Sequence, residues 1–271
     1  MRRVTLPFDR SLHAPADDLV VCQFEGLLSF PEVEHAVFTR RGGASVGPYA
    51  SLNVSRSVAD DPNAVAENNR RMLGAFGYRR EQAATAWLVH GGHVAMITRS
   101  SLSDPPPKAD AIVTRERGLP LTMRFADCVP IVLYDPERQA IGMAHAGWRG
   151  VALNVAAATI RAMVDAFGCE PRRMWAGIGP AIGVEHYEVG PDVARQVTQA
   201  CPPGARLTQV GRNGRPHIDL ATAVRSQLES LGVGSIETSG LCTASNTADW
   251  FSHRAEKDRT GRFGLLVALA V

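Results

Sequence analysis

Short runs of apolar residues alternate with longer amphipathic segments along this chain, and together they predict an α+β fold. Strands are indicated where four or five apolar residues stand between turn-forming residues. The runs of this kind are residues 36–39, 94–98, 111–114, 130–134 and 140–144. Pro130 has no backbone N–H to donate, so we expect it to lie in a loop that leads into residues 131–134.

Helices are indicated by apolar positions at helical spacing and by residues that begin or end a helix. Asp61 followed by Pro62 is typical of a helix N-terminus, so a helix is expected over residues 63–76, with Gly77 closing it. Further helices are predicted at 150–166, 191–200 and 219–231, and loops rich in Ser, Pro and Gly at 101–107 and 201–216.

The order of these elements predicts a single domain. No repeat of fixed period occurs, and the two loops are too short to act as domain linkers. We therefore expect one layered catalytic domain over residues 1–271, with mixed β-sheets flanked by helices and with residues 1–35 as an N-terminal extension packed on it.

Composition and charge limit the cellular compartment and the classes of partner that we expect for the protein. The five cysteines are scattered and form no CxxC pair, which favours a reducing compartment. The N-terminus lacks the apolar core of a signal peptide, and no run of about eighteen apolar residues occurs, so we expect a cytoplasmic protein without a membrane span. The formal charge is +2 without a dense basic run, and nucleic-acid binding is therefore not expected.

Three separate segments each place a metal-binding side chain beside small or acidic residues. His90 precedes Gly91, Cys128 follows Asp127, and His145 begins the sequence His-Ala-Gly-Trp-Arg-Gly. If the fold brings the two histidines and the cysteine together, they form a His2Cys set, and three protein ligands with an open fourth position are typical of catalytic zinc. Asp127 would then position a ligand or carry a proton.

The same residues permit other interpretations. Cys128 is a candidate nucleophile of a metal-free hydrolase, with His90 or His145 as its base and Asp127 as the orienting group. A lone cysteine before an apolar strand is also common as a packed structural residue. The second histidine favours the metal, because a cysteine and histidine dyad needs an Asn or Asp more than another imidazole. The HxE and PCxxC signature of zinc nucleobase deaminases is absent.

A series of short motifs, in order along the chain, resembles the laccase-domain family. They occupy residues 38–43, 51–53, 89–91, 109–111, 126–130, 145–150, 179–183 and 260–262. The resemblance runs from about residue 36 to the C-terminus. Bacterial members of this family have been called polyphenol oxidase, purine nucleoside phosphorylase and peptidoglycan editing factor.

The resemblance implies a fold, a site and a reaction. It implies that His90, Cys128 and His145 are a zinc triad in a layered α+β fold similar to that of the cysteine-hydrolase toxins. It also implies phosphorolysis of adenosine, inosine and methylthioadenosine, with some adenosine deamination, so that a purine nucleoside and phosphate are the expected partners.

The chain offers candidates for the contacts to such a substrate. The guanidinium fork of arginine fits phosphate oxygens. Arg40 and Arg149 lie within the family motifs, and Arg254 lies between the last two of them. We predict that these three arginines contact phosphate or ribose, together with Asn53.

The oxidase name in the family can be tested against the histidines. A multicopper centre needs many imidazoles in HxH pairs, whereas this chain has eight histidines and no HxH. We therefore expect zinc, with copper as a substitute because copper binds such ligands more tightly. A copper-loaded polyphenol oxidase, a peptidoglycan-editing amide hydrolase and a non-catalytic metal-binding protein are the alternatives. The sequence does not indicate an oligomeric state.

Overall fold

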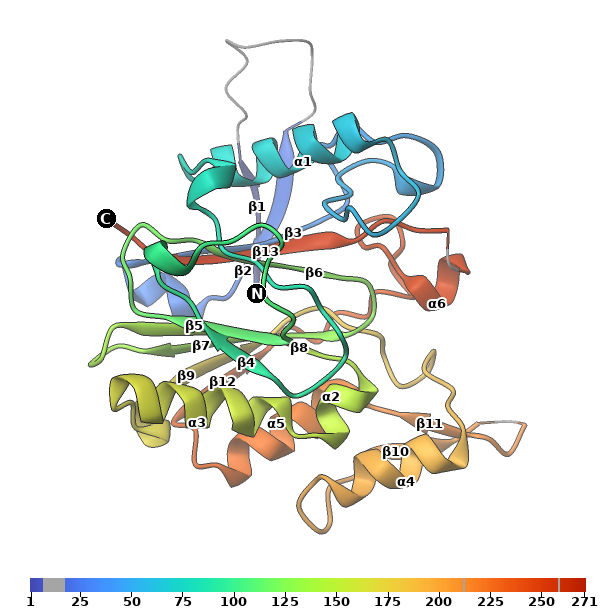
Figure 1. Cartoon of the computed structure of the whole chain (residues 1–271). Helices are drawn as coiled ribbons and strands as arrows, with labels where there is room; N and C mark the ends of the chain where they lie inside the picture. Colours follow the sequence, from blue (N-terminus) through green and yellow to red (C-terminus); the bar gives the residue numbers. More distant parts are fainter. Residues whose placement is uncertain (7–17, 212, 258) are drawn as a thin grey trace.

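Two stacked β-sheets with helices on their outer faces make up the structure (Figure 1). The computed structural model describes residues 1–6, 18–211, 213–257 and 259–271. Antiparallel and parallel pairs both occur, and the helices stand between strands along the chain. The predicted α+β class with mixed sheets is confirmed.

The first sheet is antiparallel and has the strand order β1-β2-β3-β13-β6. Its strands are β1 (Arg2–Leu6), β2 (Leu19–Gln23), β3 (Val33–Phe38), β13 (Phe263–Leu269) and β6 (Leu121–Phe125). The sheet therefore joins both ends of the chain to its middle. Part of the segment predicted as an extension, residues 1–35, supplies β1 and β2, and residues 7–17 of that segment lie outside the described residues.

The second sheet is mixed and has the strand order β12-β9-β7-β8-β5-β4. Its strands are β12 (Ser235–Thr238), β9 (Trp175–Ile178), β7 (Val129–Asp135), β8 (Ala140–Ala146), β5 (Ala111–Thr114) and β4 (Val94–Met96). The outer pairs β12·β9 and β4·β5 are parallel, and the inner pairs are antiparallel. Four of the five predicted strands lie in this sheet.

The expected loop at Pro130 is wrong, because Pro130 lies inside β7 opposite His145 of β8. The carbonyl of Pro130 accepts a hydrogen bond from Gly179, one residue beyond the end of β9. The missing N–H of Pro130 therefore falls where the neighbouring strand has already ended, and the sheet loses little by it. His145 is thus held by regular strand pairing, and Cys128 lies directly before β7.

Helices cover the outer faces of both sheets, as Figure 1 shows. Helix α1 (Pro62–Gly74) packs on the first sheet, and its N-terminus has the expected form, since the Asp61 side chain accepts from the N–H of Asn63 at 3.0 Å. The remaining helices are α2 (Trp148–Ala152), α3 (Val155–Phe167), α4 (Pro191–Gln199), α5 (Leu220–Ser230) and α6 (His253–Glu256). Helices α3 and α5 pack on the second sheet.

Two further expectations are wrong in part. The helix predicted at 150–166 is two helices, because Asn154 adopts a left-handed backbone (φ 53°) and its side chain accepts from the N–H of Ala157, which begins α3. The predicted loop 201–216 contains β10 (Thr208–Val210), which pairs with β11 (Pro216–Ile218).

The main core lies between the two sheets. It contains aromatic side chains from both, among them Phe125 and Phe263 of the first sheet and Tyr134 and Trp175 of the second. Separate apolar clusters lie under α1 and under α3 and α5. No helix in the described part of the chain is long and apolar enough to cross a bilayer.

His35 of β3 provides a test of this core by pH. Its side chain is 1% exposed, and its Nε2 accepts from the N–H of Phe24 at 2.8 Å. Burial lowers the pKa of His35 to about 4, so between the ordinary value of about 6.5 and that value only the unfolded chain takes up the proton. Stability is therefore lost as the pH falls through this window.

We expect the free energy of unfolding of the wild type to fall by about 2–3 kcal/mol more than that of His35→Gln between pH 7 and pH 4.5. Urea denaturation of both proteins at several pH values measures the difference. Parallel pH profiles for the two proteins would show that His35 is not held neutral by the core.

Candidate metal centre

The structure brings His90, Cys128 and His145 together. One ligand atom of each, a ring nitrogen or the sulfur, lies within 4.8 Å of the others. The imidazole rings of His90 and His145 meet edge to face, with centroids 5.0 Å apart. His145 is buried in β8, whereas His90 is exposed on the loop that precedes β4, so the cluster has a closed side and an open side.

The donor set fits a single thiophilic metal ion. An ion bound to all three would lie about 2.0–2.3 Å from each ligand atom, so the three atoms must lie close together, as they do here. Two imidazoles and one thiolate suit zinc or copper. Among the described residues this is the one group of three metal-binding side chains.

Asp110 holds two of the three candidate ligands in place. It is fully buried just before β5, and its Oδ1 lies 3.0 Å from Nδ1 of His145. The same carboxylate accepts the backbone N–H groups of Val89 (3.2 Å), His90 (2.9 Å) and Gly91 (2.6 Å). A carboxylate on Nδ1 fixes the imidazole so that Nε2 faces the cluster, as is usual behind metal-bound histidines.

The backbone around the cluster is specialised to leave space at the sulfur. A Cβ on Gly147 would lie 2.9 Å from Sγ of Cys128 and 3.3 Å from the His90 ring, so any larger residue would crowd the cluster. His90 and Asp127 both adopt positive φ, 57° and 87°. These turns aim the histidine and the following Cys128 toward one point.

The electrostatics favour a thiolate. Burial by itself would raise the pKa of the Cys128 thiol, but the charge and hydrogen bond of His145, with those of His90, lower it to about 6. Burial by itself would lower the pKa of His145, but Cys128 and Asp110 raise it to about 9. The thiolate is the form that binds metals and acts as a nucleophile.

The carboxylate of Asp127, next to Cys128, forms hydrogen bonds with the segment that leads into α6. Its Oδ1 accepts from the hydroxyls of Thr243 and Ser252, both at 2.7 Å, and its Oδ2 accepts from the backbone N–H of Arg254 at 2.7 Å. These three donors engage both oxygens. In this structure Asp127 thus positions the neighbouring wall of the site.

Three side chains lie near Cys128 and Asp127: those of Tyr187, Arg149 and Arg254. The Arg254 guanidinium stacks on the Tyr187 ring (4.9 Å) and donates to the carbonyl of Glu188 at 2.8 Å. Burial raises the pKa of Tyr187 to about 12, the charge of Cys128 adds to this rise, and both arginines oppose it. Arg149 stacks on Trp148 and lines an adjacent cavity of about 440 Å³ between α2 and α4.

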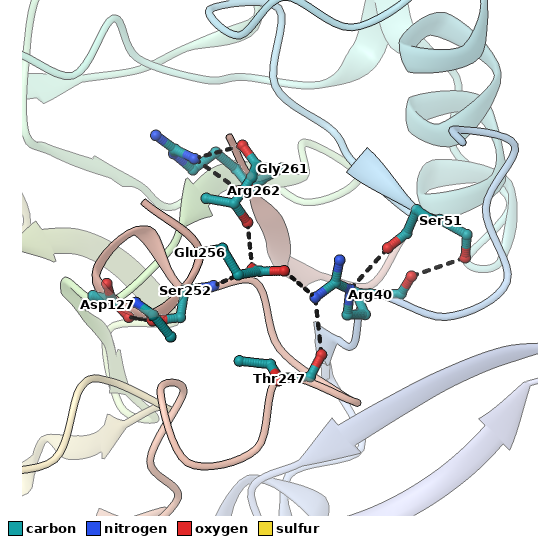
Figure 2. Close-up of polar contacts among 11 residues, drawn as sticks. Arg40, Ser51, Asp127, Thr247, Ser252, Glu256, Gly261 and Arg262 are labelled. Atoms are coloured by element: carbon teal, nitrogen blue, oxygen red, sulfur yellow. Dashed lines mark hydrogen bonds and ion pairs between the residues drawn. The ribbon is translucent and has the colours of Figure 1, made fainter. Parts of the chain in front are cut away.

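Arg40 and Asn53 do not reach the cluster. The Arg40 guanidinium donates to the carbonyls of Ala50 and Thr247 and to Glu256, each at 2.8 Å. Figure 2 shows that Glu256 in turn accepts from the N–H of Ser252, whose hydroxyl donates to Asp127, so these groups connect Arg40 to the site. Asn53 is fully buried.

Asn53 acts as a connector between two loops. Its side chain donates to Asp60 at 2.8 Å and accepts from the backbone N–H of Arg262 at 2.9 Å. Both residues therefore support the loops around the site, whereas Arg149 and Arg254 lie beside it.

Two residues at the site were not predicted from the sequence. Asp110 was recognisable only as an acid directly before a buried strand, within the motif of residues 109–111. Tyr187 carried no signal of its own, because its place beside Cys128 depends on the loop between β9 and α4.

Comparison with known proteins places the chain in a family. A family model described as multi-copper polyphenol oxidoreductase laccase matches residues 34–270. A protein of Deinococcus radiodurans named purine nucleoside phosphorylase is 41% identical over 237 residues, which cover 88% of this chain and 89% of the relative. One of Streptomyces coelicolor with the same name is 41% identical over 231 residues, 84% of this chain and 92% of the relative.

Solved structures agree with this assignment. The crystal structure of YlmD from Geobacillus stearothermophilus is 30% identical, with a TM-score of 0.87 over 99% of this chain and 100% of that chain. The crystal structure of the hypothetical protein YfiH from Bacillus licheniformis is also 30% identical with a TM-score of 0.87, over 95% of this chain and 98% of that one. The resemblance read from the motifs is thus confirmed, and the chain belongs to the multi-copper polyphenol oxidoreductase laccase family.

Proposed function

We propose that the protein is a zinc-dependent purine nucleoside phosphorylase that acts on adenosine, inosine and methylthioadenosine and deaminates adenosine as a side reaction. The observation that carries this proposal is the cluster of His90, Cys128 and His145, open at His90 and bordered by two arginines. The relatives named purine nucleoside phosphorylase support the reaction class. A purine nucleoside and inorganic phosphate are then the partners.

The proposed reaction exchanges one bond at the anomeric carbon of the ribose. An oxygen of phosphate forms a bond to this carbon while the bond from the carbon to the purine nitrogen breaks. The bonding electrons leave with the purine, which takes up a proton, and ribose 1-phosphate is the second product. In the side reaction water adds at carbon 6 of adenosine and ammonia leaves.

The residues beside the cluster supply the binding groups. Arg149 and Arg254 carry the positive charge that phosphate requires. The Tyr187 phenol carries its proton at neutral pH, as tyrosines ordinarily do, and it can therefore donate a hydrogen bond to a substrate oxygen. Asp127 holds the backbone of Arg254, and it thereby sets the position of that side chain.

His90, Cys128 and His145 would hold the zinc ion, and Asp110 would orient His145. When bound, the ion supplies a Lewis acid that polarises an oxygen or activates water, which serves the deamination most directly. Copper is the expected substitute, because it competes well for imidazole and thiolate ligands.

Turnover of adenosine with and without phosphate tests the proposal. Protein purified without added metal is analysed for zinc and copper and then incubated with adenosine. We expect adenine and ribose 1-phosphate only when phosphate is present, and inosine in both cases. Adenine release that does not depend on phosphate, or no turnover by zinc-containing protein, would contradict the proposal.

A pair of arginine variants sharpens this test. Arg254→Ala should lower kcat/KM for phosphate about tenfold or more, because one charged contact is lost, while deamination continues. Arg206→Ala, which removes an exposed arginine in the loop after α4, is the matched control and should leave both rates unchanged.

The thiolate favours a second candidate function. Cys128 paired with His145 is a suitable nucleophile and base for amide hydrolysis, as peptidoglycan editing would require. Metal-free protein that hydrolyses muropeptides, together with metal-loaded protein that leaves nucleosides intact, would favour this function over the phosphorylase.

A further inference from the structure

A second cavity lies on the outer face of the first sheet, away from the metal centre. It has a volume of about 150 Å³ and lies between α1, the outer side of β6 and the segment after α1. The neighbouring residue on β6, Phe125, points the opposite way, into the core against His145. None of the three candidate metal ligands lines this cavity.

The cavity carries an excess of positive charge. Arg56, Arg80 and Arg124 line it, and Asp104 is its one acidic lining residue. In the described part of the chain none of these arginines forms an ion pair. Arg56 and Arg80 are exposed to solvent, whereas Arg124 is partly buried.

Arg124 is a partly buried cation for which the described residues provide no counter-ion. Its Nη1 donates to the carbonyl of Ala86 at 3.1 Å, and the side chain lines the cavity. Burial lowers the pKa of Arg124, and the nearby charge of Arg262 lowers it further. A buried charge without a partner costs free energy, so an anion in the cavity would offset that cost.

Apolar and aromatic side chains also line the cavity. The Trp87 side chain is 50% exposed although it lines the cavity, and Pro105, Pro106 and Met72 line it as well. A neighbouring cavity of about 350 Å³ is lined in part by the same residues, among them Arg56 and Arg80. Such a site suits a ligand that has both a compact anion and a flat organic group.

We propose that this cavity binds a phosphate monoester, with the phosphate held by Arg124, Arg56 and Arg80 and the organic part packed on Trp87 and the prolines. Arginine matches the geometry and charge of phosphate oxygens. The site is separate from the metal centre, and it does not depend on the proposed phosphorylase activity. It would make the protein a binder of phosphorylated metabolites in addition to its activity at the metal centre.

Calorimetric titration in phosphate-free buffer tests the site, with AMP as the probe and adenosine and inorganic phosphate as comparisons. We expect AMP to bind the wild type and Cys128→Ala equally well, and adenosine and phosphate each to bind more weakly. Arg124→Gln should weaken AMP binding about tenfold or more, because a charged hydrogen bond is lost. Arg161→Gln, an exposed arginine on α3, is the matched control.

Thermal unfolding shows whether Arg124→Gln still folds. Without ligand we expect its midpoint to equal or exceed that of the wild type, because the unpaired charge has gone, whereas AMP should raise the midpoint of the wild type alone. Undetectable AMP binding, loss of AMP binding in Cys128→Ala, or equal AMP affinity in Arg124→Gln would overturn the site. Phosphate binding that is lost in Arg124→Gln and is as tight as that of AMP would overturn the assignment to a monoester.

Discussion

Replacing Cys128 by alanine is expected to release the bound metal and to reduce nucleoside phosphorolysis to background. The thiolate is the one anionic ligand in the cluster, and its charge also acts on His145. Its removal leaves two imidazoles, one of them on an exposed loop. We expect metal affinity to fall by more than about 100-fold, beyond the loss that follows when a group supporting a ligand is removed.

Metal analysis after dialysis and a competition titration with a zinc chelator measure this effect. Cys201→Ala is the matched control, because Cys201 is also partly buried but lies after α4 and contacts the carbonyl of Ala223. It should keep both metal and activity. A Cys128→Ala protein that keeps one equivalent of zinc would contradict the metal site.

Replacing Asp110 by asparagine is expected to weaken both the metal site and the fold. Asparagine presents one acceptor and one donor where the structure has donors on both sides, since Oδ1 meets His145 and the N–H of His90 while Oδ2 meets Val89 and Gly91. One side must then lose its bonds. We expect metal affinity to fall about 10–100-fold and the free energy of unfolding to fall by about 3 kcal/mol.

Asp135→Asn separates these two effects. Asp135 is equally buried, and its carboxylate also accepts three backbone N–H groups, those of Glu137, Arg138 and Glu170, at the far end of β7. Its replacement should lower stability by a similar amount without changing metal affinity. Equal metal affinity in Asp110→Asn and the wild type would show that Asp110 supports only the fold.

The sequence predicted elements whose signals are local. Helix α1 has both a cap and an N-terminal proline, and β5 is a short apolar run between polar residues, so both appeared where expected. The break between α2 and α3 was missed, because Asn154 lies within an otherwise regular apolar pattern and ends the helix by its backbone conformation.

The expected loop at Pro130 failed for a different reason. Whether a strand tolerates a proline depends on where its neighbour ends, and β9 ends just before that point. The first sheet also went largely unpredicted, although β13 is a run of seven buried residues. It pairs with β3, near the N-terminus, and with β6, in the middle of the chain. Pairing over such distances in sequence leaves no local pattern.

For the site, too, the sequence indicated the features that depend on single residues and missed those that depend on the fold. Ligand chemistry is visible in single residues, so His90, Cys128 and His145 could be proposed before their proximity was known. Binding groups are defined by their surroundings instead. Arg40 has the same side chain as Arg254, yet it is bound by Ala50 and Glu256, and no property of the sequence separates the two.

The chain passes from the first sheet to the second at the metal centre, and this gives a bound ion a mechanical role. Residues 126–128 form the crossing from β6 to β7, and His145 belongs to the second sheet. An ion held by Cys128 and His145 would fasten the start of β7 to the end of β8, at the point where the chain enters the second sheet. The geometry of the metal centre and the position of the crossing between the two sheets would then depend on the same few bonds.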